Sequence, residues 1–175
     1  MSTLSTTRDA GNTPADHAAD HNTLHAAYND ERLFVPALAL STTGGLGTDY
    51  FTLADGGSSG VSSDALTFPD HWQTMHLDLL WMQGTASAGN YRHLVTLTKY
   101  PKDGSALSST AATNTLSIAG PNNTSIWKRS RILTDAAITP VTHWYSISDL
   151  RLGADGADTG TGTVNVYGYI FVRAS

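Results

Sequence analysis

Three histidines at intervals of four residues form the pattern with the clearest capacity for chemistry. His17, His21 and His25 would share one face of an α-helix, and imidazoles at positions i and i+4 can bind one divalent metal ion. The metalloprotease pattern HExxH requires a glutamate directly after the first histidine, but this chain has Ala18 there, which excludes that chemistry. We therefore interpret the histidines as polar packing residues of a helical seam. A structural metal shared between copies of the chain is the alternative.

Other reactive side chains lack the spacing that catalysis needs. Gly56–Gly60 is rich in glycine and serine, but no strand-to-helix pattern surrounds it, as a serine nucleophile would require. Glu31 is the only glutamate, and most aspartates sit beside glycine or serine, where aspartate forms turns. Asp149, Asp155 and Asp158 do not match the spacing of an EF-hand calcium loop. Because cysteine is also absent, we predict that the chain is not an enzyme and uses no cofactor.

The four tryptophans suggest either a packed core or a surface that stacks on sugar rings. Trp81 is in phase with Met75, Leu77 and Leu79, which predicts that it is buried. Trp72 follows a turn at residues 69–71, so we expect it to be exposed. The candidate ligand-binding residues for a glycan are therefore Trp72 and Trp127, with core or interface packing as the alternative.

The composition excludes several classes of partner. The 175 residues carry a formal net charge of −5 and only residues 128–131 are locally basic, so we expect no nucleic-acid partner. No apolar run approaches the roughly 18–20 residues of a membrane span, and no secretory leader pattern is present, so we expect no membrane partner. Sixteen glycines, mostly clustered, and few charged residues favour a chain rich in β-structure with tight turns.

The N-terminal region is predicted to be an extended arm followed by one helix. Thr13 suits the N-cap and Pro14 the first helical position, and the helix should end between Asn29 and Arg32. Its seam is weakly apolar, so the helix should pack against copies of the chain or a partner protein. We assign residues 1–36 to an anchor whose interface residues are His17, His21, Leu24, His25, Tyr28, Leu33 and Phe34.

Residues 37–175 are predicted to form one antiparallel β-sandwich or jelly roll. Hydrophobic alternation recurs between turn signals from residue 37 to the end of the chain, with expected strands at 37–40, 51–53, 65–68, 74–82, 91–100, 115–119, 125–133, 142–147 and 162–173. Both faces of the last strand are apolar. We expect its valines and Ile170 to line the core, which would leave Tyr167, Tyr169 and Phe171 on an outer face as a subunit interface.

Three short patches resemble structural proteins of tailed bacteriophages. Residues 13–29 contain the segment DHN-x-LH-x-A-x-N, residues 66–72 read LTFPDHW, and a turn at residues 158–159 precedes the last strand at 164–173. The resemblance implies a virion component with a C-terminal β domain, commonly a homotrimer. Longer fibres of this kind carry Gly-X-Y repeats between helix and β domain, and their absence here favours a compact surface knob.

The resemblance and the layout together predict a capsid decoration or head-fibre protein. Residues 1–36 would bind the major capsid protein or another virion protein, and the β domain would trimerise, with assembly in the host cytoplasm. The alternative is a tail-fibre or baseplate tip that recognises a host-surface glycan. A cell-wall hydrolase is the third hypothesis, and the spacing of acidic residues does not favour it.

Overall fold

The computed structural model of this chain describes residues 31–42, 45–46, 49–105 and 108–174. The predicted arm and helix, with His17, His21, Leu24, His25 and Tyr28, lie outside these ranges. Within them, no helix combines the length and apolar character that crossing a membrane requires.

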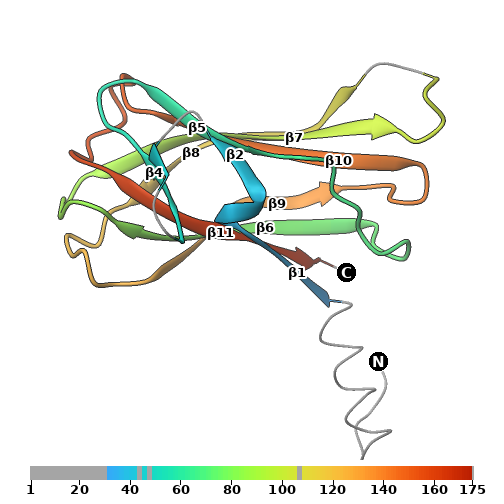
Figure 1. Cartoon of the computed structure of the whole chain (residues 1–175), viewed down its shortest axis with the longest axis horizontal. Coiled ribbons are helices and arrows are strands. Elements are labelled where there is room, and N and C mark those ends of the chain that lie inside the picture. Colours follow the sequence, from blue (N-terminus) through green and yellow to red (C-terminus); the bar gives the residue numbers. More distant parts are fainter. Residues whose placement is uncertain (1–30, 43–44, 47–48, 106–107, 175) are drawn as a thin grey trace, which may run out of the picture.

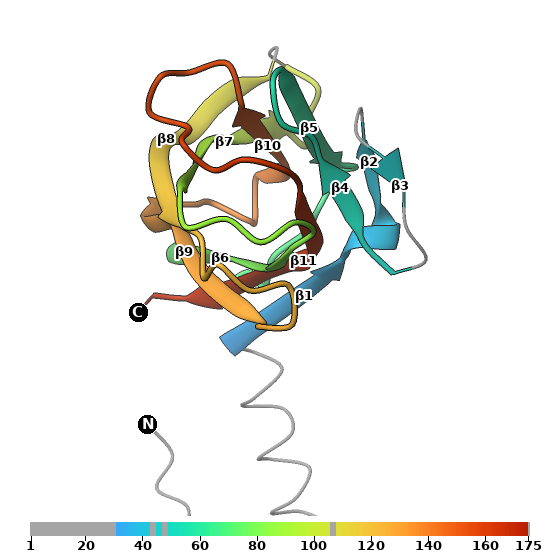
Figure 2. The ribbon, with the colours of Figure 1, turned by 90° about the vertical axis from the view of Figure 1, so that its left-hand side faces the viewer.

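Two antiparallel sheets pack face to face (Figures 1 and 2). One has six strands, which are β1 (Arg32–Pro36), β3 (Gly45–Leu46), β4 (Phe51–Leu53), β6 (Thr74–Gln83), β9 (Lys128–Ala137) and β11 (Val164–Arg173). The other has five, which are β2 (Leu40–Thr42), β5 (Ser58–Ser63), β7 (Asn90–Pro101), β8 (Ser109–Ala119) and β10 (His143–Leu152). The 3-10 helix η1 (Ala37–Ala39) connects β1 to β2.

Most neighbouring strands in each sheet come from distant parts of the chain. In the six-stranded sheet the order is β3-β4-β11-β6-β9, and β1 pairs with the part of β11 that β4 leaves free. In the five-stranded sheet the order is β2-β5-β10-β7-β8. At one side of the sandwich β8 lies next to β9, where the Asn114 side chain donates to the carbonyl of Ile132 (2.9 Å). The predicted β-sandwich of jelly-roll type is therefore confirmed.

Most predicted strands are present, but the chain enters the sandwich earlier than expected. Residues 32–36, which sequence patterns assigned to the anchor, form β1. All five pair with residues 168–172 of β11. The boundary expected between residues 36 and 37 is therefore wrong. Sequence reasoning also missed β5, because its SSGVSS sequence resembles a loop. Residues 65–68, expected as a strand, contribute one isolated bridge, between Leu66 and Tyr145.

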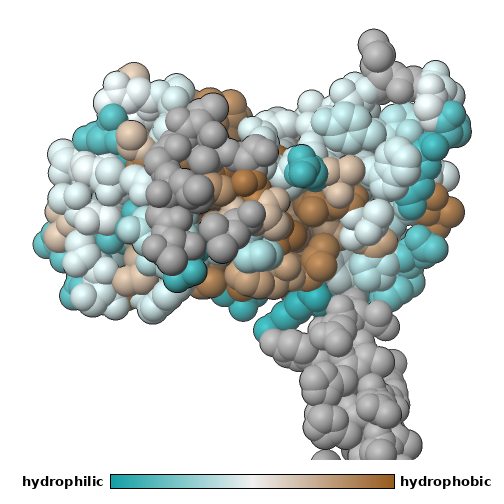
Figure 3. Space-filling model, in the orientation of Figure 1, coloured by the Kyte–Doolittle hydropathy of each residue, from teal (hydrophilic) through white to brown (hydrophobic). Residues whose placement is uncertain are grey.

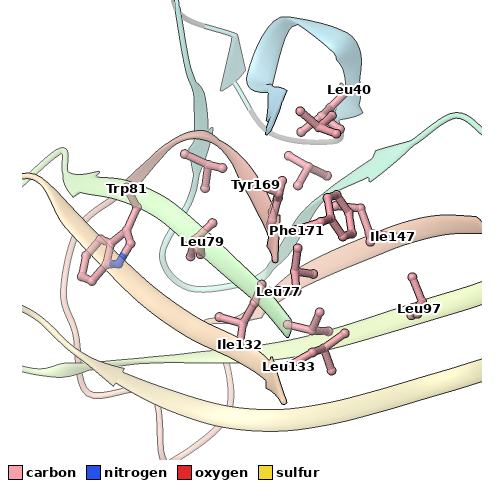
Figure 4. Close-up of a cluster of buried hydrophobic side chains, with 14 of the residues drawn as sticks. Leu40, Leu77, Leu79, Trp81, Leu97, Ile132, Leu133, Ile147, Tyr169 and Phe171 are labelled. Atoms are coloured by element: carbon pink, nitrogen blue, oxygen red, sulfur yellow. The ribbon is translucent and has the colours of Figure 1, made fainter. Parts of the chain in front are cut away.

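Side chains from the inner faces of both sheets fill the core (Figure 4). In β6, the predicted alternation holds, and Met75, Leu77, Leu79 and Trp81 are all buried. The opposing strands of the five-stranded sheet contribute a second row, which includes Tyr91, Val95, Leu97, Tyr145 and Ile147. Such alternation is what an antiparallel sheet with one buried face requires.

A β-bulge in β11 changes which face its side chains occupy. The pairing with β6 shifts between Val166 and Gly168, so one extra residue is accommodated on β11. Val164 and Val166 point inward before the bulge, and Tyr169 and Phe171 point inward after it, each fully buried. The expectation that Tyr169 and Phe171 lie on an outer face is wrong, because an unbroken alternation was assumed. Of the three aromatic residues, only Tyr167 lies outside the core.

The bulge depends on Gly168. Its φ angle is +154°, and a Cβ atom there would lie 2.5 Å from the carbonyl oxygen of Val35 and 2.7 Å from the ring of Phe34. The Phe34 ring is therefore seated directly against the backbone of residue 168. A side chain at this position would separate β1 from β11.

We predict that Gly168→Ala destabilises the sandwich by about 1–3 kcal/mol, because the backbone is strained for any other residue and the new methyl group collides with β1. Gly57→Ala is the matched control, since a Cβ atom at Gly57 meets nothing within 4 Å. Thermal unfolding should show a midpoint several degrees lower for the first variant and little change for the second. Equal midpoints would contradict the role of Gly168.

A polar contact crosses the core between the two sheets. On β10, Asp149 accepts a hydrogen bond from Nδ1–H of His93 on β7 (2.8 Å) and another from the hydroxyl of Tyr169 on β11 (2.8 Å). All three side chains are buried, so the contact is shielded from water. Burial, followed by the negative charge of Asp149 and its hydrogen bond, raises the pKa of Tyr169 well above its usual value of 10.

This pKa shift predicts a loss of stability in alkali that Tyr169→Phe removes. Above pH 10 the unfolded chain releases the Tyr169 proton while the folded chain keeps it, so the free energy of unfolding falls by about 1.4 kcal/mol per pH unit from this group. Urea unfolding on both sides of pH 10 measures the difference between the wild type and the variant. Parallel pH dependences would show that Tyr169 is not protected as described.

The loop that leads into β11 is held by a second buried charge. Arg151 on β10 is fully buried and forms an ion pair with Asp158 (Nε to Oδ2, 2.9 Å). Its guanidinium also donates to the carbonyls of Gly160 and Gly162 and lies over the ring of Tyr91. These partners offset the cost of burying the charge and fix the loop.

Candidate functional site

The structure separates the two tryptophans that were expected to contact a ligand. Trp72 is only 1% exposed and stacks on Phe68, with ring centroids 5.8 Å apart. The expectation that Trp72 is exposed is therefore wrong, because the turn at residues 69–71 directs the chain into the core. Trp127 is 54% exposed, so it remains available to a partner.

Two further exposed rings lie together on the five-stranded sheet. Trp144 on β10 and Tyr100 on β7 are register partners, and each ring is about 40% exposed. Directly opposite residues of paired strands place their side chains side by side on the same face. The hydroxyl of Tyr100 lies 3.2 Å from the hydroxyl of Ser146, which fixes the tilt of the tyrosine.

These rings line an open groove of about 520 Å³, which we call the Trp144 groove. Its lining residues are Ser63, Asp64, Ala65, Tyr100, Pro101, Trp144 and Ser146. The groove forms where β5 ends, β7 ends and β10 begins, so three segments distant in sequence build it. It combines two aromatic surfaces with hydroxyl groups and one carboxylate, which is the usual mixture in a site that orients a small polar ligand.

The sheet surface that continues from the groove carries many hydroxyl groups. On β7 and β10 the outward positions beyond the rings pair Thr98 with Ser146 and Thr96 with Ser148. Each hydroxyl can donate one hydrogen bond and accept two. The outer face of the five-stranded sheet therefore offers rings at one end, then hydroxyl groups, and then the leucine pair Leu94 and Leu150.

Trp127 belongs to a different surface, on the six-stranded sheet. Its ring lies 4.3 Å from that of Tyr167, which in turn lies 5.2 Å from the ring of Tyr50. We call these three residues the Trp127 cluster. Partial burial, then the nearby charges of Tyr50 and Asp49, raise the pKa of Tyr167 above its usual value of 10. The three rings are packed against one another at tilted angles, with interplanar angles of 52° for Trp127 and Tyr167 and 47° for Tyr50 and Tyr167.

Histidine and acidic side chains do not form a metal-binding cluster in the described part of the chain, where no group of three or more could hold a metal ion. The closest pairing of a histidine with a carboxylate, His93 with Asp149, is fully buried and therefore out of reach of a substrate. Asp158, whose spacing from Asp149 and Asp155 does not match a calcium loop, forms an ion pair with Arg151.

Sequence reasoning missed Trp144 and Tyr100 as site residues. The available signal was the alternation within β10, where Tyr145 and Ile147 are buried and Trp144 must therefore face outward. Tyr100 is likewise out of phase with the buried Leu97 and Val95, so it also faces outward. What no sequence pattern could supply is their pairing, because Tyr100 and Trp144 are 44 positions apart in the chain.

The sequence matches no known family model and no curated protein. Among solved structures, the chain is similar to the C-terminal CBM6 of LamC, a marine laminarinase from Zobellia galactanivorans (TM-score 0.43, 11% identity, 81% of this chain and 99% of that one). It is also similar to the CBM36-1 domain of a multidomain xylanase from the hindgut metagenome of Trinervitermes trinervoides (0.44, 17%, 82% and 98%). A chain of infectious bursal disease virus, Gt strain, is similar as well (0.42, 13%, 76% and 32%).

The burial of the tryptophans predicts different costs of truncation. Trp72→Ala should destabilise the fold by about 3–5 kcal/mol, because it opens a cavity beside Phe68. Trp127→Ala and Trp144→Ala should cost less than about 1 kcal/mol each, since both rings are largely exposed. Chemical denaturation of the three variants measures these differences. A tolerated Trp72→Ala would contradict its place in the core.

Proposed function

We propose that this chain is a non-catalytic carbohydrate-binding protein that holds a glycan in the Trp144 groove. The observation that carries the proposal is the pair of adjacent exposed rings, Tyr100 and Trp144, in a groove that also presents hydroxyl groups and the Asp64 carboxylate. A sugar ring has an apolar face of C–H groups and a rim of hydroxyls. It can stack on the aromatic rings while its rim exchanges hydrogen bonds with the groove.

The groove also indicates the kind of glycan. Asp64 is the one charged side chain in its lining, and it is exposed. A carboxylate accepts hydrogen bonds from sugar hydroxyls but repels uronic and other acidic sugars. The proposed ligand is therefore an uncharged or amino-sugar-containing glycan.

The proposed biological setting is the virion of a tailed bacteriophage. It rests on the sequence resemblance of residues 13–29, 66–72 and 158–173, and residues before β1 would attach the domain to the major capsid protein or another virion protein. Within this setting, the groove favours a receptor-binding tip that recognises host-surface glycan. The capsid decoration or head-fibre role with a homotrimeric β domain is the second proposal. It is favoured by the apolar outer face of the six-stranded sheet.

A glycan array that carries neutral and acidic bacterial surface polysaccharides tests the proposed activity. We expect the full chain to bind neutral members, and calorimetry with an oligosaccharide of the best ligand should show about tenfold weaker binding for Trp144→Ala, which corresponds to about 1.4 kcal/mol. Tyr100→Ala should have a comparable effect.

Trp127→Ala is the matched control, because it removes an exposed ring of the same type from the opposite face. Retained affinity in Trp144→Ala combined with loss in Trp127→Ala would move the site to the Trp127 cluster. Silence on the array, with unchanged adsorption of particles that carry Trp144→Ala, would refute glycan binding.

A further inference from the structure

We infer that the outer face of the six-stranded sheet, along β1 and β11, is an interface with a second copy of this chain. This inference extends the self-association proposed above and assigns it to a surface. We call this surface the Phe34 face and define it by Phe34, Pro36, Leu80, Ile170 and Val172.

The register of the sheet places these residues together. Phe34 pairs with Ile170, Pro36 pairs with Gly168, and Gly168 pairs with Leu80 on the next strand. Because paired residues share a face, the apolar side chains of β1 and β11 lie side by side, and Leu80 extends them onto β6 between Asp78 and the end of the strand. Phe34 is one of the large apolar residues at the surface, and it is 51% exposed.

The contrast between the two outer faces argues that the Phe34 face is covered. On the five-stranded sheet, the outward positions of β7 and β10 carry two pairs of threonine with serine and one leucine pair, Leu94 with Leu150. On the six-stranded sheet, the outward positions of β1 and β11 carry Phe34, Pro36, Ile170 and Val172, and β6 adds Leu80 beside Asp78 and His76. A contiguous apolar area with a polar boundary is typical of a protein interface. Figure 3 views a different side of the molecule, the edge formed by β1, β2 and β4, where hydrophobic residues gather in the middle.

The boundary of the face is ionic and satisfied within the chain. The row that begins with Phe34 and Ile170 continues to Asp78 on β6 and Arg131 on β9. Asp78 is nearly buried by ion pairs with Arg129 and Arg131. A partner on the Phe34 face would therefore contact apolar side chains on one side and ion pairs on the other. It would not need to supply a counter-ion for Asp78.

Phe34 is held in position before any partner arrives. Its ring rests on Gly168, as the short distances to a Cβ atom at residue 168 show. A ring that is already fixed loses little conformational entropy when it becomes buried, so its apolar area contributes more fully to association.

The location of the N-terminal segment selects another copy as the occupant. Thirty residues precede the described chain, which enters the sheet at Arg32, two positions before Phe34. Copies joined through the Phe34 face would bring these segments close together. The predicted helical seam of His17, His21, Leu24 and Tyr28 is too weakly apolar to be stable alone, and a high local concentration of identical segments would favour its pairing.

Light scattering of the full chain over a range of micromolar concentrations tests the inference. We expect the wild type to show two or three times the 18.5 kDa of one chain, Phe34→Asp to show a single chain, and Val141→Asp to behave as the wild type. Val141 is the matched control, since it is an exposed apolar residue (64%) away from this face. A monomeric wild type, or a Phe34→Asp variant of unchanged mass, overturns the inference.

Thiol labelling gives a second measurement that does not depend on how well Phe34→Asp folds. Because the chain has no cysteine, Val172→Cys and Val141→Cys each provide one reactive group. Maleimide should react at least tenfold more slowly with Val172→Cys at high than at low protein concentration, and equally with Val141→Cys. Concentration-independent labelling of both refutes the interface. Glycan binding is measured separately, so failure of the interface and failure of the proposed function are distinguishable.

Discussion

The bulge between Val166 and Gly168 is the constraint on which the arrangement of the sandwich depends. It reverses the alternation of β11 halfway along the strand, so that the valines enter the core at one end and the aromatic residues enter it at the other. Without the extra residue, Tyr169 could not reach Asp149, and the polar contact between the sheets would be lost. The same shift turns Ile170 and Val172 outward and opens the notch that receives Phe34.

The two outer faces differ in chemistry. The five-stranded sheet presents hydroxyl groups and, at the ends of β7 and β10, two rings beside a carboxylate. The six-stranded sheet presents aliphatic side chains next to ion pairs that are complete within the chain. A polar ligand can exchange hydrogen bonds with the first face, whereas the second gains most by excluding water. In the proposed function, the sandwich can therefore bind a glycan on one face while copies of the chain meet on the other.

The buried charges serve the fold rather than chemistry. Arg151 fixes the loop before β11 through Asp158 and backbone carbonyls, and His93, Asp149 and Tyr169 connect β7, β10 and β11. Both groups are closed to solvent, so neither can act on a substrate. Each is nevertheless sensitive to change, because removal of one partner would leave a polar or charged group unpaired in the core.

Local patterns in the sequence were sufficient for the fold class and for most strands. Alternation in 74–82 and the turn residues between strands predicted an antiparallel sandwich, because burial of one face leaves a period of two in the chain. Patterns of this kind failed where tertiary contacts override them. The SSGVSS strand was missed because only its neighbours, β2 and β10, make it a strand. Trp72 was placed outside although a turn carries it into the core.

The candidate site was decided by tertiary structure alone. Trp144 and Tyr100 become one surface only when β10 pairs with β7, and Asp64 joins them only when β5 pairs with β10. The outward turn of Ile170 and Val172 likewise follows from a bulge whose extra residue is defined by pairing with β6. The sequence by itself determined which residues prefer to be buried. The pairing of distant strands determined which of them are buried, because register is a property of two segments and not of either one.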